Sequence, residues 1–479
     1  MEAFLNAITG DIANRFVVFF LDKCSKITGQ TTESKRLQHD LQRLLLRVRA
    51  IVEEAEGRHI TNKAMIYQLN ILRKEMYRGY FTMDSLRIRG YEEVNAKGHD
   101  VSRSFSLSKF NVAKRLLLST EDTHREKDML QVLGSLNNIM VHMNESIAFF
   151  NNYPPLYRQP YSMHLYIGKC MFGRQMEMDR VIDFLLQIEH PSNKNVGVLP
   201  IVGPTYVGKS TLVAHVCNDV RVRNHFSQIV VLTGAETSDE SLTTLKHKGV
   251  IMHKSNALGK NDRVLTVIEF TKAVDEVAWN SLYSSAYDSL GRSSKIIITS
   301  RSNEIIKFGT TQTLVLNFLP LEAYWYFFKI LTFGSVDSND HPKFESIAME
   351  MARGMNGSFI DAQFHSDFLR NNLDVEYWCM YFTTFKAYIQ RNISLFGENP
   401  YALSRRNKPT SFWINSTGKF LLFCQYRSCF AEDNVPAIAF HDVVSGSVEC
   451  EGEFEVLAWK SHILPYKYYV VRCMIEKSQ

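Results

Sequence analysis

The sequence predicts a multidomain α + α/β protein: an N-terminal four-helix bundle, a parallel α/β domain, a helical subdomain and a β-rich C-terminal tail. Three observations predict this order. Apolar residues recur at helical spacing before residue 150, unbroken apolar runs separated by helical segments follow residue 196, and β-forming residues dominate the end of the chain. The 479 residues, 45% hydrophobic and 22% charged, correspond to about three domains and exclude a disordered or collagen-like chain.

Residues 1–150 are predicted to form the helical domain, and residues 151–168 a linker. Amphipathic segments with polar connections fit either an antiparallel bundle or a coiled-coil surface for a partner, and the apolar stripes alone do not separate the two. The N-terminal apolar run is bounded by Arg15 and Asp22 and lacks a cleavage site, so it does not resemble a signal peptide. The four segments are 4–20, 33–57, 62–86 and a last one that opens near Thr120.

Residues 169–320 are predicted to form the α/β domain. Its apolar runs lack polar alternation and are separated by helical segments, which is typical of a buried parallel sheet. Residues 321–400 are predicted to be helical, and residues 401–479 are rich in β-forming side chains. The five predicted strands are 196–202, 228–232, 264–270, 295–300 and 313–319.

A glycine-rich stretch directly follows the first of these strands and matches the phosphate-binding pattern GxxxxGK[ST]. Its glycines allow backbone N–H groups to turn toward phosphate oxygens, and the helix behind it offers its positive N-terminus. Lys209 is predicted to reach the β- and γ-phosphates, and the Ser210 hydroxyl to ligate Mg²⁺. These residues predict a P-loop NTPase domain that binds ADP or ATP. The stretch reads Gly203-Pro204-Thr205-Tyr206-Val207-Gly208-Lys209-Ser210-Thr211.

Efficient hydrolysis by a P-loop ATPase also requires a carboxylate at the end of a neighbouring strand. The strand 263–270 ends with Glu269, which is predicted to be the catalytic carboxylate and, together with Ser210, a ligand of Mg²⁺. The alternative is that Glu269 is only a solvated residue at the end of its strand. Phe270 stands where a second acid is expected, and it neither ligates metal nor activates water. The sequence therefore predicts at most a slow ATPase. Arg301, after the next strand, stands where a γ-phosphate sensor is useful, although an exposed arginine there is common.

Several blocks in order resemble the plant NLR disease-resistance proteins of the coiled-coil NB-ARC type, a branch of the STAND P-loop ATPases. Residues 172–177 (FGRQME) resemble the opening motif that packs over the adenine, and 294–301 (SKIIITSR) resemble the sensor strand. The strand ending in Glu269 stands at the Walker B position, and 321–333 resemble the start of the next helical subdomain. Residues 1–150 resemble, more loosely, the Rx N-terminal-like coiled-coil domain.

The resemblance implies roles for individual residues. Gly208, Lys209, Ser210 and Thr211 bind the phosphates, and Arg301 senses the γ-phosphate. The sequence Phe440-His441-Asp442 resembles the MHD motif, whose histidine approaches the β-phosphate of ADP, although a surface turn explains it equally well. The family alternates between an ADP-bound resting state and an ATP-bound oligomer, which implies a molecular switch.

The chain also departs from the family pattern. The paired Walker B acids appear as Glu269-Phe270, and the GLPL motif as Met355-Asn356-Gly357-Ser358-Phe359-Ile360 without its proline. The acidic motif of the third helix keeps one acid, Asp84. No leucine-rich repeats follow before Gln479, so a truncated receptor is expected.

These observations favour a nucleotide-dependent switch or regulator in plant defence signalling, with a pseudo-NTPase scaffold as the alternative. Self-association or binding to other coiled-coil domains is expected through residues 1–150, and a membrane role only by family analogy. A net charge of +5 does not indicate nucleic-acid binding. The absence of a signal peptide or apolar span, and eight scattered cysteines without a CxxC pair, predict a cytoplasmic protein.

Overall fold

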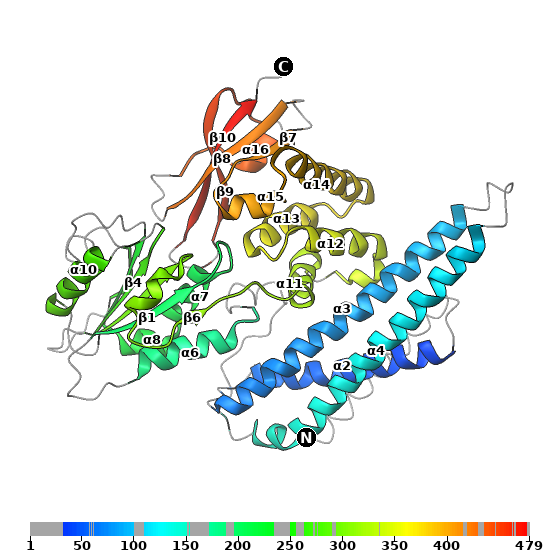
Figure 1. The fold of residues 1–479 in the computed structure, drawn as a ribbon, viewed down its shortest axis with the longest axis horizontal. Coiled ribbons are helices and arrows are strands. Elements are labelled where there is room, and N and C mark those ends of the chain that lie inside the picture. Colours follow the sequence, from blue (N-terminus) through cyan, green and yellow to red (C-terminus); the bar gives the residue numbers. More distant parts are fainter. Residues whose placement is uncertain are drawn as a thin grey trace. The chain divides into compact units, whose positions relative to one another are not determined.

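The computed structural model describes residues 32–99, 110–153, 172–187, 196–233, 250–254, 263–334 and 336–476, apart from short gaps within these ranges (Figure 1). The first predicted helix (4–20) and most of the predicted linker (151–168) lie outside the described residues. The chain divides into two compact units, residues 1–161 with 321–350 and residues 162–320 with 351–479.

Three long helices build the first unit: α2 (Thr32–Glu56), α3 (Lys63–His99) and α4 (Phe110–Phe149). Each contacts the other two, and the apolar stripes meet in a core that includes Leu45 and Leu136. α3 is longer than the sequence predicts because polar turns continue it beyond its apolar stripe, and α4 begins at Phe110, before the predicted start near Thr120. No described helix is both long and apolar enough to cross a bilayer.

The same unit includes α11 (Leu321–Phe333) and most of α12 (Pro342–Gly354), and α11 packs on α3. α11 is apolar on most sides, with Trp325 and Phe328 fully buried, so it requires cover from more than one neighbour.

A buried charge cluster joins α3 to these two helices. The carboxylate of Asp84 accepts hydrogen bonds from Trp325 Nε1 (2.9 Å) and from Lys329 Nζ (2.8 Å), and it pairs with Arg87 (2.8 Å). Glu345, which is fully buried, pairs with Arg87 and with Lys329 (2.8 Å). Burial opposes ionisation, but Lys329 and Arg87 hold the pKa of Asp84 below its usual value. The two acids and two bases thus neutralise each other inside this unit.

The second unit begins with an α/β domain around a six-stranded sheet of order β3-β2-β4-β5-β1-β6. Two apolar layers cover its faces, one under α6 (Gln175–Leu186), α7 (Lys209–Asn218) and α8 (Val220–His225) and one that includes residues of α10 (Glu276–Ser289). The strands are β1 (Gly197–Val202), β2 (Gln228–Thr233), β3 (Val250–Lys254), β4 (Val264–Glu269), β5 (Lys295–Ser300) and β6 (Leu314–Val315).

The sheet is mixed rather than wholly parallel. β3 runs antiparallel to β2 at one edge, and it is not among the five strands predicted from the sequence. Its residues VIMHK place a histidine and a lysine beside only three apolar residues, so β3 lacks the apolar run that marks a central strand. The other five strands are parallel, and β6 pairs with β1 through two residues only.

The rest of this unit is helical and then β-structured, as the sequence predicts. α13 (Phe359–Asn371), α14 (Val375–Phe396) and α15 (Pro400–Arg405) precede an antiparallel sheet of order β7-β8-β10-β9. Phe440 of the short helix α16 (Phe440–Ser445) and Val456 and Val471 of the sheet share its core. The strands are β7 (Thr410–Ile414), β8 (Lys419–Cys429), β9 (Glu453–Lys460) and β10 (Tyr468–Glu476).

Candidate functional site

The loop between β1 and α7 has the geometry of an anion-binding turn. Gly208 is the N-cap of α7, adopts the left-handed conformation at φ 94°, and has no side chain to cap the helix. The first N–H groups of α7 therefore have no intrahelical acceptor and face the loop. At Gly203, an added Cβ would lie 2.5 Å from the carbonyl oxygen of Leu316, so only glycine fits there. This cradle fits the phosphates of a nucleotide.

Lys209 lies in the first turn of α7 and closes the loop from inside. Its Nζ donates hydrogen bonds to the carbonyl oxygens of Gly203 (2.7 Å) and Pro204 (2.8 Å). Burial lowers the pKa of Lys209 to about 8; Lys467 and Arg301 act in the same direction, and Glu269 opposes them. A phosphate would supply the missing negative charge and favour the protonated amine.

Glu269 lies at the carboxyl end of β4, in register with Thr299 of β5, and is buried. Its Oε2 lies 2.6 Å from Nζ of Lys467, which lies just before β10, and the same Nζ lies 3.4 Å from Oγ of Ser210. Burial alone would raise the pKa of Glu269, but Lys467 holds it below its usual value with help from Ser210 and Lys209. The structure thus brings Ser210 and Glu269 close to each other, and the ammonium of Lys467 contacts both side chains.

A Mg²⁺ ion does not fit this arrangement. The ion requires octahedral oxygen ligands at about 2.0–2.1 Å, and the ammonium of Lys467 already contacts both predicted ligand atoms. Within the described part of the chain, no group of three or more His, Cys, Asp and Glu side chains is placed to hold a metal.

Phe270 turns away from this site into the core. It is 4% exposed, packs edge-on against Trp279 with ring centroids 6.4 Å apart, and belongs to the apolar layer on one face of the sheet. The position after Glu269 therefore contributes to packing, and it offers no group that would polarise a water molecule.

The other predicted site residues lie in three places. Arg301 directly follows β5 with an exposed side chain, close enough to Lys209 to lower its pKa. Thr211 is half-buried in the first turn of α7. His441 lies in the first turn of α16, and its side chain is outside the described part of the structure.

Residues of the degenerate GLPL segment approach the α/β domain. Gly357 has a φ of 86°, and its Cβ position lies 3.2 Å from Phe318. The guanidinium of Arg405 stacks over the ring of Phe318 at 4.0 Å and donates a hydrogen bond to the carbonyl oxygen of Asn356. This segment therefore contacts Phe318, which follows β6, although the segment lacks the proline of the GLPL motif.

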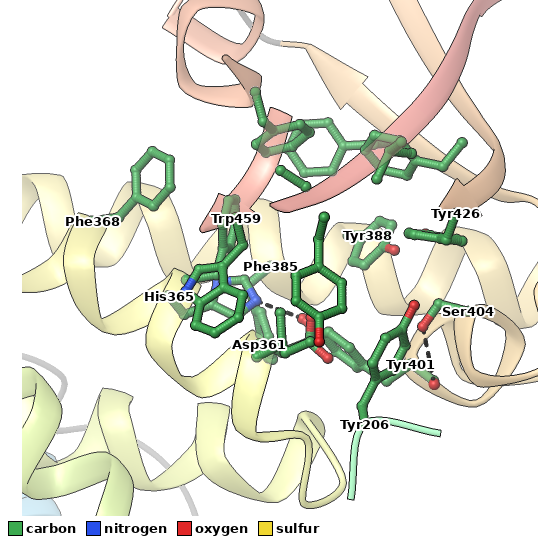
Figure 2. A pocket seen from close by; sticks show the side chains of 18 of the residues that line it. Tyr206, Asp361, His365, Phe368, Phe385, Tyr388, Tyr401, Ser404, Tyr426 and Trp459 are labelled. Atoms are coloured by element: carbon green, nitrogen blue, oxygen red, sulfur yellow. Dashed lines mark hydrogen bonds between the residues drawn. The ribbon is translucent and has the colours of Figure 1, made fainter. Parts of the chain in front are cut away.

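Tyr206 connects the glycine-rich loop to a cavity of about 150 Å³ between the helices and the C-terminal sheet (Figure 2). Its φ of 65° is unusual for a residue with a side chain, and its ring contributes to the wall of the cavity. His365 also lines the cavity, and its ring nitrogens form hydrogen bonds with Tyr381 Oη (2.7 Å) and Tyr401 Oη (2.8 Å). Burial lowers the pKa of His365 to about 3, so this histidine is neutral.

Sequence reasoning missed Lys467 and Tyr206 as site residues. Lys467 stands between two tyrosines in a β-rich segment and belongs to no motif. Tyr206 occupies a variable position of the phosphate-binding pattern. Only the folded chain shows that both side chains connect the loop region to the C-terminal part of this unit.

Comparison with known proteins agrees with this geometry. The chain matches the NB-ARC domain family over residues 174–337. It is similar to "Disease resistance protein RGA2" of Solanum bulbocastanum, 25% identical over 203 residues that cover 39% of this chain and 20% of that protein. It is also similar to "Putative disease resistance RPP13-like protein 1" of Arabidopsis thaliana, 25% identical over 293 residues that cover 57% of this chain and 27% of that protein.

The glycine-rich loop, the sheet and the carboxylate at the end of β4 define a P-loop nucleotide-binding domain. Residues 174–337 match the NB-ARC domain family, and the chain is similar to plant proteins described as disease resistance proteins. The matched part spans less than a third of the length of either relative.

Proposed function

We propose that this chain is a nucleotide-dependent switch or regulator in plant defence signalling, and that its P-loop binds ADP and ATP. The observation that carries the proposal is the loop itself: a left-handed Gly208 opens α7, and Lys209 points across the loop. The similarity to plant disease resistance proteins gives the signalling context. Gly203, Ser210 and Thr211 complete the proposed phosphate site, with Arg301 as the γ-phosphate sensor.

Tyr206 and Lys467 support the switch. Each joins the P-loop region to the C-terminal part of the same unit, Tyr206 through the cavity and Lys467 through Glu269. A change at the phosphates therefore acts directly on contacts made by β10 and its neighbours. In this proposal residues 169–320 bind nucleotide, 321–400 and 401–479 respond to it, and the helices of 1–150 mediate self-association or contact other coiled-coil domains.

Lys209→Ala tests the binding function. Removing the ammonium deletes a charge-assisted contact to the phosphates, and we expect the affinity for ADP and ATP to fall about 100-fold. Isothermal titration calorimetry measures both affinities. Lys254→Ala is the matched control, because Lys254 is exposed on edge strand β3 and should leave both affinities unchanged. Equal affinities in wild type and Lys209→Ala would remove the P-loop from the binding site.

A second function, a pseudo-NTPase scaffold, is favoured by the positions of Phe270 and Lys467. Phe270 is part of the core, and Lys467 pairs with Glu269, the carboxylate at the predicted catalytic position. A scaffold keeps its nucleotide without exchange or hydrolysis, whereas a switch exchanges it and changes oligomeric size. Nucleotide exchange followed together with light scattering separates the two.

A further inference from the structure

We propose that the ammonium of Lys467 takes the place of Mg²⁺ in the P-loop site, so that this chain binds a nucleoside diphosphate without a metal ion. The inference rests on the nucleotide-binding function proposed above and adds the cation that the site uses.

The position of Lys467 carries the first step. Its Nζ lies 2.6 Å from Glu269 and 3.4 Å from Ser210, the two residues that the P-loop pattern assigns to Mg²⁺. The side chains of Lys467 and Glu269 are only 11% and 12% exposed, so water screens their attraction little. Mg²⁺ binding to these oxygens would require Lys467 to move away. That movement would break the buried ion pair between Lys467 and Glu269.

The backbone around Lys467 holds it in this position. The hairpin that connects β9 and β10 is closed by two hydrogen bonds, from Lys467 N to Ser461 Oγ and from Ser461 N to Lys467 O, both 2.8 Å. The Nζ also lies 6.0 Å from the centroid of the Tyr469 ring, at the outer limit of a cation–π contact. Lys467 is therefore a fixed part of the C-terminal sheet and not a mobile surface lysine.

Charge explains why the nucleotide would accept this cation. Burial lowers the pKa of Lys209, and Lys467 and Arg301 lie near enough to lower it further, against the opposing effect of Glu269. A diphosphate placed on the N-terminus of α7 would meet three basic side chains and one carboxylate. The negative charge of the diphosphate, which Mg²⁺ normally balances, is thus balanced by basic side chains of the protein.

The test compares ADP affinity in EDTA and in magnesium, using the full chain freed of nucleotide. We expect wild type to bind ADP equally in both media, within about twofold. Lys467→Ala should bind at least about tenfold more weakly in EDTA and regain affinity in magnesium, because removal of the ammonium uncovers Glu269 and Ser210 for the ion. Lys460→Ala is the control: Lys460 is an exposed lysine of the same hairpin and should behave like wild type.

A second readout uses the wild type alone and does not depend on how the variant folds. Electron paramagnetic resonance measures the Mn²⁺ that is bound when ADP is present. The amount bound with wild-type protein and ADP should not exceed the amount that the same ADP binds without protein. Mn²⁺ bound in that complex, or ADP affinity that rises tenfold or more with magnesium, would overturn the inference while leaving the nucleotide site intact. ADP that binds in neither medium would overturn the proposed function as well.

Discussion

Asp84→Ala is expected to destabilise the helical unit by about 3–5 kcal/mol, because it removes one partner from a buried ion cluster. Asp84 accepts from Trp325 and Lys329 and pairs with Arg87, and its loss leaves a cluster with two bases and one acid. Chemical denaturation of the full chain, with hydrogen exchange of α3 and α11 measured by mass spectrometry, reports the change in the unit concerned.

Two comparison variants separate charge from hydrogen bonding. Asp84→Asn keeps an acceptor for Trp325 but removes the charge, so we expect an intermediate loss. Glu53→Ala breaks an exposed ion pair with Arg49, with side chains 54% and 41% exposed, and should change stability by less than about 1 kcal/mol. If Asp84→Ala were as mild as Glu53→Ala, the cluster would not be what joins α3 to α11 and α12.

Asp361→Asn is expected to stabilise the second unit at neutral pH by about 2–3 kcal/mol. Asp361 lines the cavity in the first turn of α13, and burial raises its pKa to about 6, with Ser358 and Arg405 opposing the shift. An unfolded aspartate has a pKa of about 3.9, so the folded chain binds the proton more tightly. Stability is therefore fully present below about pH 4 and decreases as the pH rises through 6.

Denaturation midpoints of the wild type and Asp361→Asn, measured from pH 4 to pH 8, test this sign. The two curves should meet near pH 4, separate progressively between pH 4 and pH 6, and run parallel at higher pH. Asp367→Asn is the control on the same helix, because Asp367 is 48% exposed and pairs with Arg370 at 2.6 Å. A wild type that gains stability between pH 4 and 6 relative to Asp361→Asn would show that the carboxylate is stabilised, not penalised, by its surroundings.

The α/β core was predictable because its signals are local. The apolar runs of β1, β2, β4 and β5 are continuous, and the glycine-rich loop follows β1 directly. β3 escaped prediction because an edge strand needs no continuous apolar run. The polar end of α3 was missed for a similar reason: its helical turns continue beyond the apolar stripe that marks the helix.

The site was predictable only where it follows a motif. The residues from Gly203 to Thr211 are consecutive, whereas Lys467 is 198 positions from Glu269 and 257 from Ser210. The contact of Asp84 with Lys329 spans 245 positions. Such pairs depend on how separate elements pack, and a single lysine or aspartate carries no sequence pattern that reveals its partner.

The nucleotide content of the freshly purified chain tests the central claim most directly. The protein is denatured, and the supernatant is separated by ion-exchange chromatography against ADP and ATP standards. A P-loop site held by Lys209 predicts close to one ADP per chain in wild type and none in Lys209→Ala. A folded wild type that carries no nucleotide and takes up neither ADP nor ATP would contradict the claim that this loop binds phosphate.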